Sequence, residues 1–308
     1  MAQHRAAECN DDLELYLRQV SEIFDIPCII DERQEKSQIM SYYSANRLTY
    51  RLSYSWEGFV HCGLSYDGRR KKEDLKEQVR IIEQYIREMK AQRVLELGSG
   101  FGANSAYLAR RNPQVTFDAV DFSTKPLKRF AKIPNIRFHC GDYHDLTTFE
   151  DNAYDAAFVI EALCHSTNKQ QALREVKKKL RPGGIFVVID VYQTNRATRL
   201  NRAEDLMWQL ITRGAASEPF ERVNDVENYM RDDYSVIVTT NMSQYVLPTF
   251  ERQKSLVRYY FSHPFFAKTV NRFVPLEIAK NSIVVLLLPT SVRRKILCYY
   301  LHVLQKEC

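Results

Sequence analysis

The amino-acid sequence predicts an α/β fold built on a doubly wound, mostly parallel sheet. Between residues 93 and 190, short apolar segments of strand length alternate with helical patterns of about a dozen residues, which is typical of βαβ units. A glycine-rich segment, 98–103, stands between the first of these strands and the helix that follows it. The chain has 308 residues, of which 45% are hydrophobic and 27% charged, so its composition is that of a globular protein with a sizeable core.

The segments before the first strand are expected to form an N-terminal cap over residues 1–72. Within it, apolar side chains recur at helical spacing over 11–24, and residues 42–66 are rich in tyrosine. Apolar residues on one face then predict a helix over 73–89, at the start of the core.

A core domain is expected over residues 73–243. Its strands are predicted at 93–97, 116–120, 136–139, 156–160, 185–189 and 234–239. Its further helices are predicted at 103–111, 168–180, 198–212 and 220–231. The second of these ends at Arg181-Pro-Gly-Gly184, because proline and glycine stop a helix. The three lysines at 177–179 are expected to be a solvated helix end.

The remaining residues are assigned to a helical lid, 244–296, and a last strand of the core sheet, 297–308. The lid is crowded with aromatic side chains over 245–280. In 298–305, tyrosine and valine cluster in an alternating pattern that favours a strand. The alternative is a basic amphipathic helix over 292–304 that lies on a membrane.

Charge and cysteine usage exclude several classes of protein. There are 44 Lys and Arg against 38 Asp and Glu, a net charge of +6 that is mixed along the chain and favours no nucleic-acid partner. Seven cysteines with no Cys-x-x-Cys pair predict neither a disulfide framework nor a metal site. Reduced thiols and the lack of a secretory pattern in the first residues predict a cytoplasmic location.

The glycine-rich segment has the pattern Gly-x-Gly-x-x-Ala, from Gly98 to Ala103. Because a strand precedes it and a helix follows it, the segment is typical of a loop that binds a nucleoside cofactor. Glycines allow the tight turn and let the backbone approach a ligand closely. Asp121 ends the next strand, 23 residues after Gly98, where a carboxylate can accept both ribose hydroxyls.

Acidic residues near this loop indicate which cofactor it binds. Glu96 stands two residues before Gly98, where a carboxylate opposes a pyrophosphate but suits a cation. S-adenosylmethionine carries a sulfonium and an ammonium and no phosphate. Asp142 can accept a hydrogen bond from the adenine amino group, while Phe122 or Tyr143 covers the ring. The residues predicted to bind the cofactor are Glu96, Gly98, Ser99, Gly100, Asp121, Phe122, Gly141, Asp142, Tyr143 and Glu161.

These segments together resemble the class I S-adenosylmethionine-dependent methyltransferases. The segments that carry the resemblance are Glu96–Gly102, Asp121, Gly141-Asp142, Glu161–His165 and Leu180–Gly184. The resemblance covers about residues 93–190. It implies a seven-stranded sheet whose last strand is antiparallel, and this supports the strand predicted at 298–305.

Two segments resemble one group within that family. Tyr50–His61 and Glu161–His165 are similar to segments of sterol side-chain methyltransferases, and related segments occur in tocopherol and other small-molecule methyltransferases. The chain differs from the sterol pattern because Trp56 has Ser55 and Glu57 as neighbours instead of glycines. It also lacks the Asn-Pro-Pro-Tyr type of loop that resembles base-modifying enzymes, so a macromolecular acceptor is not expected.

The expected function is therefore methyl transfer from S-adenosylmethionine to a small hydrophobic acceptor, such as a terpenoid, sterol-like or lipid-like molecule. Attack by an alkene leaves a carbocation, which aromatic faces and a carboxylate stabilise before a base removes a proton. Tyr54, Trp56 and Glu161 are the predicted stabilisers, and His61 or His165 is the predicted base.

Several alternatives stay open. Oxygen or nitrogen methylation of a natural product needs only one base, for which His165 is the candidate. A nicotinamide-dependent oxidoreductase also fits the glycine pattern, and so does a non-catalytic protein that binds the cofactor. A peripheral membrane contact and a homo-oligomer are further alternatives for the partners of the chain.

Overall fold

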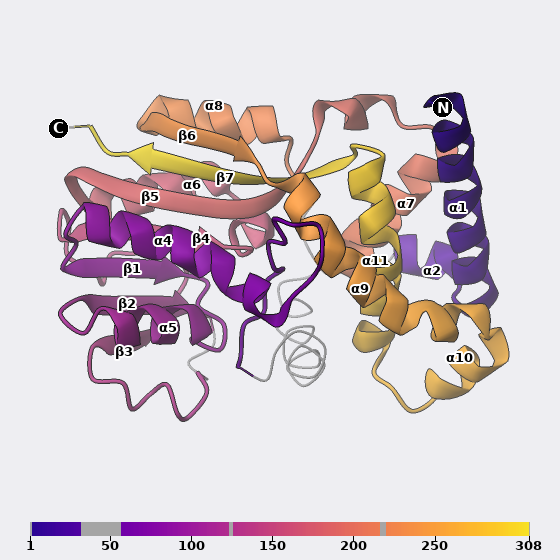
Figure 1. The fold of residues 1–308 in the computed structure, drawn as a ribbon, viewed down its shortest axis with the longest axis horizontal. Helices are drawn as coiled ribbons and strands as arrows, with labels where there is room; N and C mark the ends of the chain where they lie inside the picture. The colour runs from indigo at the N-terminus through magenta and orange to yellow at the C-terminus, as the bar shows by residue number, and fades with distance from the viewer. Residues whose placement is uncertain (1, 32–56, 123–125, 216–219, 308) are drawn as a thin grey trace.

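A computed structural model describes residues 2–31, 57–122, 126–215 and 220–307 (Figure 1). Its centre is a seven-stranded sheet with the strand order β3-β2-β1-β4-β5-β7-β6. The strands are β1 (Arg93–Leu97), β2 (Thr116–Asp121), β3 (Ile136–Cys140), β4 (Tyr154–Ile160), β5 (Leu180–Gln193), β6 (Ser235–Asn241) and β7 (Leu297–Gln305). All six strands predicted in the core are confirmed, and the sheet is the doubly wound one expected.

The last strand, β7, runs against the other six. It pairs antiparallel with β5 on one side, where Val187 faces Val303, and with β6 on the other, where Val238 faces Val303. The strand predicted at 298–305 is thus confirmed, and the alternative of a membrane helix over 292–304 was wrong. The physical reason is that β7 lies between two neighbouring strands, which satisfy its backbone on both edges, while its side chains are mostly buried on the two faces of the sheet.

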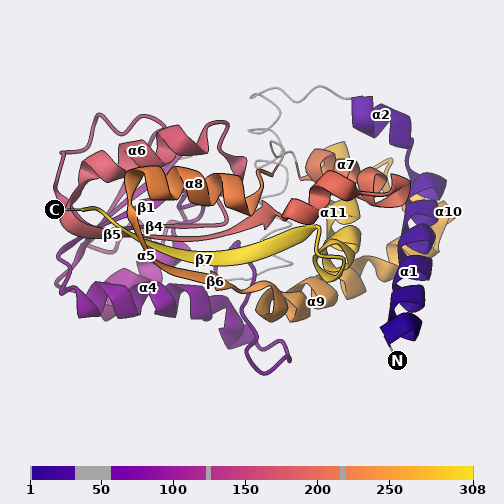
Figure 2. The same cartoon turned by 90° about the horizontal axis from the view of Figure 1, so that it is seen from above.

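Helices cover both faces of the sheet (Figure 2). One face carries α4 (Glu77–Glu88) and α5 (Ala103–Arg111), and the other carries α6 (Lys169–Lys179) and α8 (Val223–Asp233). Strand side chains alternate between these layers, so Val94 is buried with α4 and α5 whereas Leu95 is buried with α6 and α8. Both faces of the central strands are therefore apolar, as in other buried parallel sheets.

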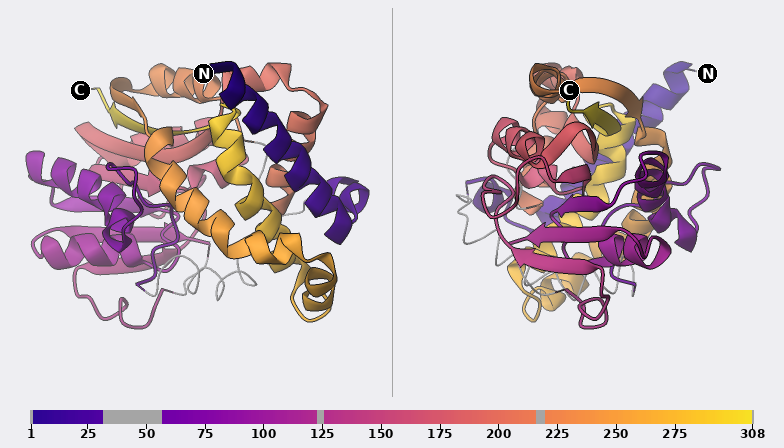
Figure 3. Two further views of the ribbon diagram at one scale, coloured as in Figure 1. Left: turned by 45° about the vertical axis from the view of Figure 1, so that its right-hand side comes forward. Right: turned by 90° about the vertical axis from the view of Figure 1, so that its left-hand side faces the viewer.

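A helical unit stands beside the sheet (Figure 1, Figure 3). Its helices are α1 (Ala2–Ile23), α2 (Ile26–Asp31), α7 (Arg202–Gly214), α9 (Ser243–Ser262), α10 (Pro264–Val270) and α11 (Leu276–Arg293). The chain passes from α11 into β7, whose first residue, Leu297, pairs with Gln193 at the end of β5. The unit therefore lies at the carboxyl ends of the parallel strands, where ligands bind in open α/β sheets.

Helix α11 is the centre of this unit and packs against α7 and α9. The approach to α7 is close, because a Cβ on Gly214 would lie 2.7 Å from Val284 and 2.9 Å from the Lys280 carbonyl oxygen. Helix α7 falls in the segment expected to be core, yet it packs with the segment expected to be the lid. The division of the chain at 243 and 296 stays a prediction.

Three short helices complete the described part of the chain. They are η1 (Lys72–Lys76), η2 (Leu163–His165) and η3 (Asn195–Arg199). Among the helices that the structure describes, none has the length and apolar character that crossing a membrane would require.

Candidate active site

The glycine loop joins β1 to α5 and is held in backbone conformations that favour glycine. The φ angles of Gly98, Gly100 and Gly102 are +64°, +54° and +81°. A Cβ on Gly98 would lie only 2.3 Å from the Cβ of Ala162, and a Cβ on Gly102 would lie 2.6 Å from the Phe138 ring. The loop therefore passes directly against the turn that follows β4, and Gly98 and Gly102 are required by both conformation and space.

Glu96 lies behind this loop as a buried carboxylate, with 1% of its surface exposed. Asn104 Nδ2 donates to its Oε1 at 3.1 Å, and the Ser105 hydroxyl donates to its Oε2. Burial raises the pKa of Glu96 to about 7, although these hydrogen bonds act in the opposite direction. The carboxyl is thus close to half ionised at neutral pH, and a cation bound nearby would favour its charged form.

Asp121 stands at the end of β2, beside the glycine loop. Its Oδ2 accepts a 2.8 Å hydrogen bond from the Gly100 amide, and its carbonyl oxygen accepts one from Gly141. Phe122 follows it with half of its surface exposed, and its ring centroid is 6.3 Å from that of Tyr143. Tyr143 is itself buried and donates its hydroxyl to the Ala162 carbonyl at 3.0 Å. Of the two aromatic candidates, Phe122 is therefore the ring that is accessible to a ligand.

Asp142 is held by a residue that the sequence analysis missed. Its Oδ1 accepts from the backbone amide of His144 at 2.9 Å and from His144 Nδ1 at 2.5 Å. His144 Nε2 in turn lies 2.7 Å from the Ser166 hydroxyl, one residue after His165. This bridge fixes the loop after β3 to the turn after β4, and the only sequence signal for His144 is its place directly after Gly141-Asp142-Tyr143.

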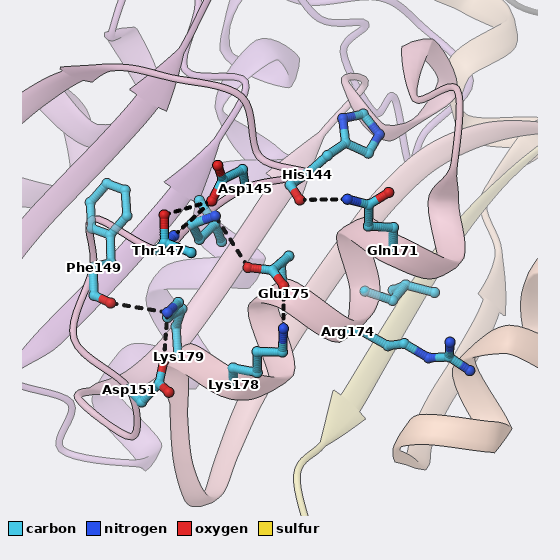
Figure 4. A network of polar contacts seen from close by, with 12 residues as sticks. His144, Asp145, Thr147, Phe149, Asp151, Gln171, Arg174, Glu175, Lys178 and Lys179 are labelled. Atoms are coloured by element: carbon cyan, nitrogen blue, oxygen red, sulfur yellow. Dashed lines mark hydrogen bonds and ion pairs between the residues drawn. The ribbon is translucent and has the colours of Figure 1, made fainter.

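Helix α6 also holds the loop after β3 (Figure 4). Asn168 caps the helix by accepting from the Gln171 amide, and the Gln171 side chain donates to the His144 carbonyl at 2.9 Å. Lys179 donates to the Phe149 carbonyl at 3.0 Å and is buried. The expectation that Lys177–Lys179 is a solvated helix end was therefore wrong for Lys179, because its long side chain reaches a carbonyl under the loop.

Glu161 follows β4 in a left-handed backbone conformation, with φ at +48°. Its Oε1 accepts from the Cys62 amide at 2.7 Å and from the Tyr299 hydroxyl at 2.6 Å. Gln78 Nε2 donates to both the Tyr299 hydroxyl and the Cys62 carbonyl, at 2.6 and 2.9 Å. Burial and the negative charge of Glu161 keep the pKa of Tyr299 well above its usual range, so Tyr299 stays a neutral donor. These hydrogen bonds fix Glu161 at the carboxyl end of β4.

The two candidate histidines have different surroundings. His61 is buried, with Nδ1 3.1 Å from the Cys62 carbonyl oxygen and Nε2 3.1 Å from Asn104 Oδ1, so both ring nitrogens are engaged inside the protein. His165 ends η2, and its burial together with the charge of Lys169 lowers its pKa to about 4. His165 is thus neutral at pH 7 and can accept a proton.

Tyr54 and Trp56, the other two predicted catalytic residues, lie outside the described residues. The structure brings together Glu96, Glu161, His61, His165 and the predicted cofactor residues at the carboxyl ends of β1 to β4. Asn104, His144, Ser166 and Tyr299 join this group without having been predicted from the sequence.

Comparison with known proteins agrees with the resemblance that the sequence motifs indicate. Residues 95–188 match the family model described as a methyltransferase domain. The sterol 24-C-methyltransferase of Saccharomyces cerevisiae is 24% identical over 54% of this chain and 46% of its own length. An S-adenosyl-L-methionine-dependent Diels-Alderase of Talaromyces variabilis is 26% identical over 63% of this chain and 70% of its own length.

Solved structures with the same fold include the [4+2]-cyclase SpnF, which is 18% identical with a TM-score of 0.69 and covers 89% of this chain and 96% of its own. The chain spans about half the length of most curated relatives it matches.

Residues 95–188 thus match a methyltransferase domain on a seven-stranded sheet with an antiparallel last strand, in agreement with the resemblance to class I S-adenosylmethionine-dependent methyltransferases.

Proposed function

We propose that this chain binds S-adenosylmethionine at the glycine loop and transfers its methyl group to a small, largely apolar acceptor. The observation that carries the proposal is the buried carboxylate of Glu96 behind the loop. A phosphate-bearing cofactor would bring negative charge toward this carboxylate, whereas a cationic donor would stabilise its ionised form. When bound, the donor supplies an electrophilic methyl group.

The residues around the loop have separate tasks in this proposal. Asp121 binds the ribose hydroxyls, Asp142 accepts from the adenine amino group, and Phe122 covers the ring. The backbone of Gly98, Ser99 and Gly100 lines the site where the donor binds. Asp121 also accepts from the Gly100 amide, so the ribose contact and the shape of the loop depend on one carboxylate. Gly141 and Tyr143 support Asp142 from the backbone and from the core.

The basicity of His165 supports methylation of carbon over methylation of oxygen. A base whose conjugate acid has a pKa of about 4 is poorly matched to the proton of a hydroxyl group, because proton transfer is most efficient when the pKa is near the working pH. A carbocation is a far stronger acid, so even a weak base removes its proton. The expected step is attack by an alkene on the methyl carbon, cleavage of the sulfur–carbon bond, and loss of a proton to His165.

Glu161 supports the same reaction as an anionic group near the acceptor. Its Oε1 accepts from the Cys62 amide and the Tyr299 hydroxyl, and these two hydrogen bonds hold the carboxylate in place. A fixed carboxylate of this kind stabilises positive charge as it develops on the acceptor. Tyr54 and Trp56, from the tyrosine-rich segment, remain the residues proposed to stabilise the same cation with their aromatic faces.

Two measurements test the proposal. Calorimetric titration should show binding of S-adenosylmethionine and its demethylated product, and no comparable binding of NADH; the reverse order of affinity would refute it. Incubation of a cell extract with a labelled methyl donor should then give a methylated apolar product in mass spectrometry. Asp121→Ala should abolish both signals, while Asp145→Ala, on an exposed turn, should preserve them.

Two comparisons favour a second candidate, cyclisation of a bound polyene without methyl transfer. The Diels-Alderase aligns over a larger share of both chains than the sterol enzyme does, and the [4+2]-cyclase shares the fold. Mass spectrometry distinguishes the two reactions, because cyclisation leaves the mass of the acceptor unchanged. A product of unchanged mass, formed equally by His165→Ala, would favour cyclisation.

A further inference from the structure

An exposed group of apolar side chains lies at the junction of α9, α10 and α11, and we call it the aromatic corner. It consists of Leu256, Tyr259, Phe265, Phe266, Phe273 and Leu276, which are six of the ten large hydrophobic side chains exposed among the described residues. Phe265 and Phe273 are 88% and 83% exposed. Single exposed apolar residues are normal, but a group confined to 21 residues of sequence indicates an interaction surface.

The exposure follows from how α10 is built. Pro264 starts the helix, and Ala267 is fully buried against the helical unit, so the neighbouring Phe265, Phe266 and Lys268 are turned away from the core. The Tyr259 ring stacks on His263 at 4.0 Å and meets Phe266 edge-on at 5.4 Å, which links α9 to α10 across the corner. Helix α10 lies at an outer corner of the molecule, away from the sheet (Figure 1, Figure 3).

The charge around the corner has one sign. From Arg252 to Leu276 the sequence contains five Lys and Arg and no Asp or Glu, although the whole chain has 44 basic and 38 acidic residues. Four of the five side chains are exposed, namely Arg252, Arg258, Lys268 and Arg272. Within the part of the chain that the structure describes, none of these four forms an ion pair with a carboxylate. The positive charge is therefore available to a partner.

We propose that the aromatic corner docks the protein on the surface of a membrane that contains anionic lipids. Exposed phenylalanines enter the boundary between headgroups and acyl chains, tyrosine lies at headgroup level, and Lys and Arg bind anionic headgroups. The charge complementarity favours this occupant over a second copy of the chain, because two copies would bring like charges together. The inference goes beyond the proposed function, since docking requires no methyl transfer.

The position of α9 gives this contact a consequence for the acceptor. The helix starts beside β7, where Ser243 Oγ accepts from the Tyr299 amide at 2.9 Å, and it ends at the corner. Its 20 residues span about 30 Å, so this one helix connects the candidate site, at Tyr299, to the aromatic corner. If the acceptor is lipid-like, as the proposed function states, docking places the enzyme where that acceptor is dissolved.

The test is co-sedimentation of the whole chain with vesicles of phosphatidylcholine, with and without phosphatidylglycerol. Binding is expected with the anionic vesicles and should weaken as salt is added. The triple variant Arg258→Gln, Lys268→Gln, Arg272→Gln should bind on the order of 100-fold more weakly, because each cation near an anionic surface contributes separately. Phe265→Ser with Phe273→Ser should lose binding as well.

Ile237→Ser is the matched control, because Ile237 is 52% exposed on β6 and lies outside the corner. It should bind vesicles like the wild type. Titration with S-adenosylmethionine should be unchanged in all these variants, so loss of docking is separated from loss of the proposed function. Wild-type sedimentation from the phenylalanine variant would overturn the proposal. So would a dimer in vesicle-free solution that the same variant dissociates.

Discussion

The Tyr299 hydroxyl donates a 2.6 Å hydrogen bond to Glu161 Oε1 and so joins β7 to the turn after β4, across 138 residues of sequence. Gln78 donates to Tyr299 and to the Cys62 carbonyl, and the Cys62 amide donates to the same oxygen of Glu161. These four residues close a ring of hydrogen bonds. The ring holds Glu161 in a left-handed conformation that costs of order 1–3 kcal/mol and persists only where its surroundings fix it.

Tyr299→Phe should therefore disturb the site and the fold together. Removal of the hydroxyl leaves Gln78 and Glu161 each short of a partner, so we expect a loss of about 1–2 kcal/mol in the free energy of unfolding. Turnover should fall at least several-fold, whereas the affinity for S-adenosylmethionine should change little. Tyr192→Phe is the control, because the Tyr192 hydroxyl is buried on β5 without a hydrogen-bond partner among the described residues. That variant should be as stable as the wild type or more so, and equal losses in both variants would contradict the role of Tyr299.

Gly98→Ala tests the contact between the glycine loop and the turn after β4. The new Cβ would lie 2.3 Å from Ala162, so either the loop or the turn must move, and cofactor affinity should fall by at least about tenfold, or about 1.4 kcal/mol. Gly183→Ala is matched in backbone conformation, with φ at +75°, but its Cβ would meet nothing within 4 Å. It should lose about 1–2 kcal/mol of stability and keep its cofactor affinity. Calorimetry and thermal unfolding measure both quantities.

Glu96→Gln should make the cofactor-free protein more stable at pH 8 and weaken cofactor binding. The pKa of Glu96 is raised from 4.5 to about 7, so the folded state favours the protonated carboxyl. The folded state therefore loses stability as the pH rises from 4.5 to about 7 and the carboxyl ionises. The penalty above pH 7 is on the order of 3 kcal/mol, since each unit of pKa shift corresponds to about 1.4 kcal/mol. The variant's advantage in thermal unfolding should shrink toward pH 5.

Glu83→Gln is the contrasting control for this measurement. Glu83 is also buried but pairs with Arg87 at 2.5 Å and Arg111 at 2.9 Å, so its replacement leaves cations without their partner. It should lose stability at pH 8 where Glu96→Gln gains it. A change in stability of the same sign in both variants at pH 8 would contradict the raised pKa of Glu96.

His165→Ala should reduce turnover on the order of 100-fold and leave cofactor affinity unchanged. Because the pKa of His165 is lowered to about 4, the base form persists at mildly acid pH, and the acid limb of the turnover profile should lie near pH 4. Lys169 contributes to this shift through its charge, so Lys169→Gln should move the limb to higher pH. An acid limb near pH 6.5 in the wild type would exclude His165, as it stands in this structure, from the role of base.

The fold could be predicted because each central element carries its own local signal. The glycine turn, the strand that ends at Asp121 and the stop at Arg181–Gly184 depend on residues that adjoin one another in sequence. The last strand could not be assigned from its own residues alone, because 292–304 also fits an amphipathic helix. What decides it is pairing with β5 and β6, which is a property of the folded sheet and not of the segment.

The residues predicted to bind the cofactor could be named from the sequence for the same reason and stay a prediction, whereas the contacts that hold them in place could not be named. Asn104 and Ser105 are ordinary polar residues in the first turns of α5 until the fold places Glu96 beneath them. His144 and Ser166 are 22 residues apart, and Tyr299 is 138 residues from Glu161. No spacing rule connects such pairs, because only the order of strands in the sheet determines which turns become neighbours.

The antiparallel strand also has a consequence for the nascent chain. β7 pairs with both β5 and β6, so until residues 297–305 leave the ribosome one edge of β5 and both edges of β6 are open. A chain released before Leu297 would keep the glycine loop but would leave β6 unpaired and one edge of β5 open, and it would lack the hydroxyl that fixes Glu161. Translation of β7 is therefore the event that both fixes Glu161 and covers the open edge of β5, which would otherwise be free to pair with another chain.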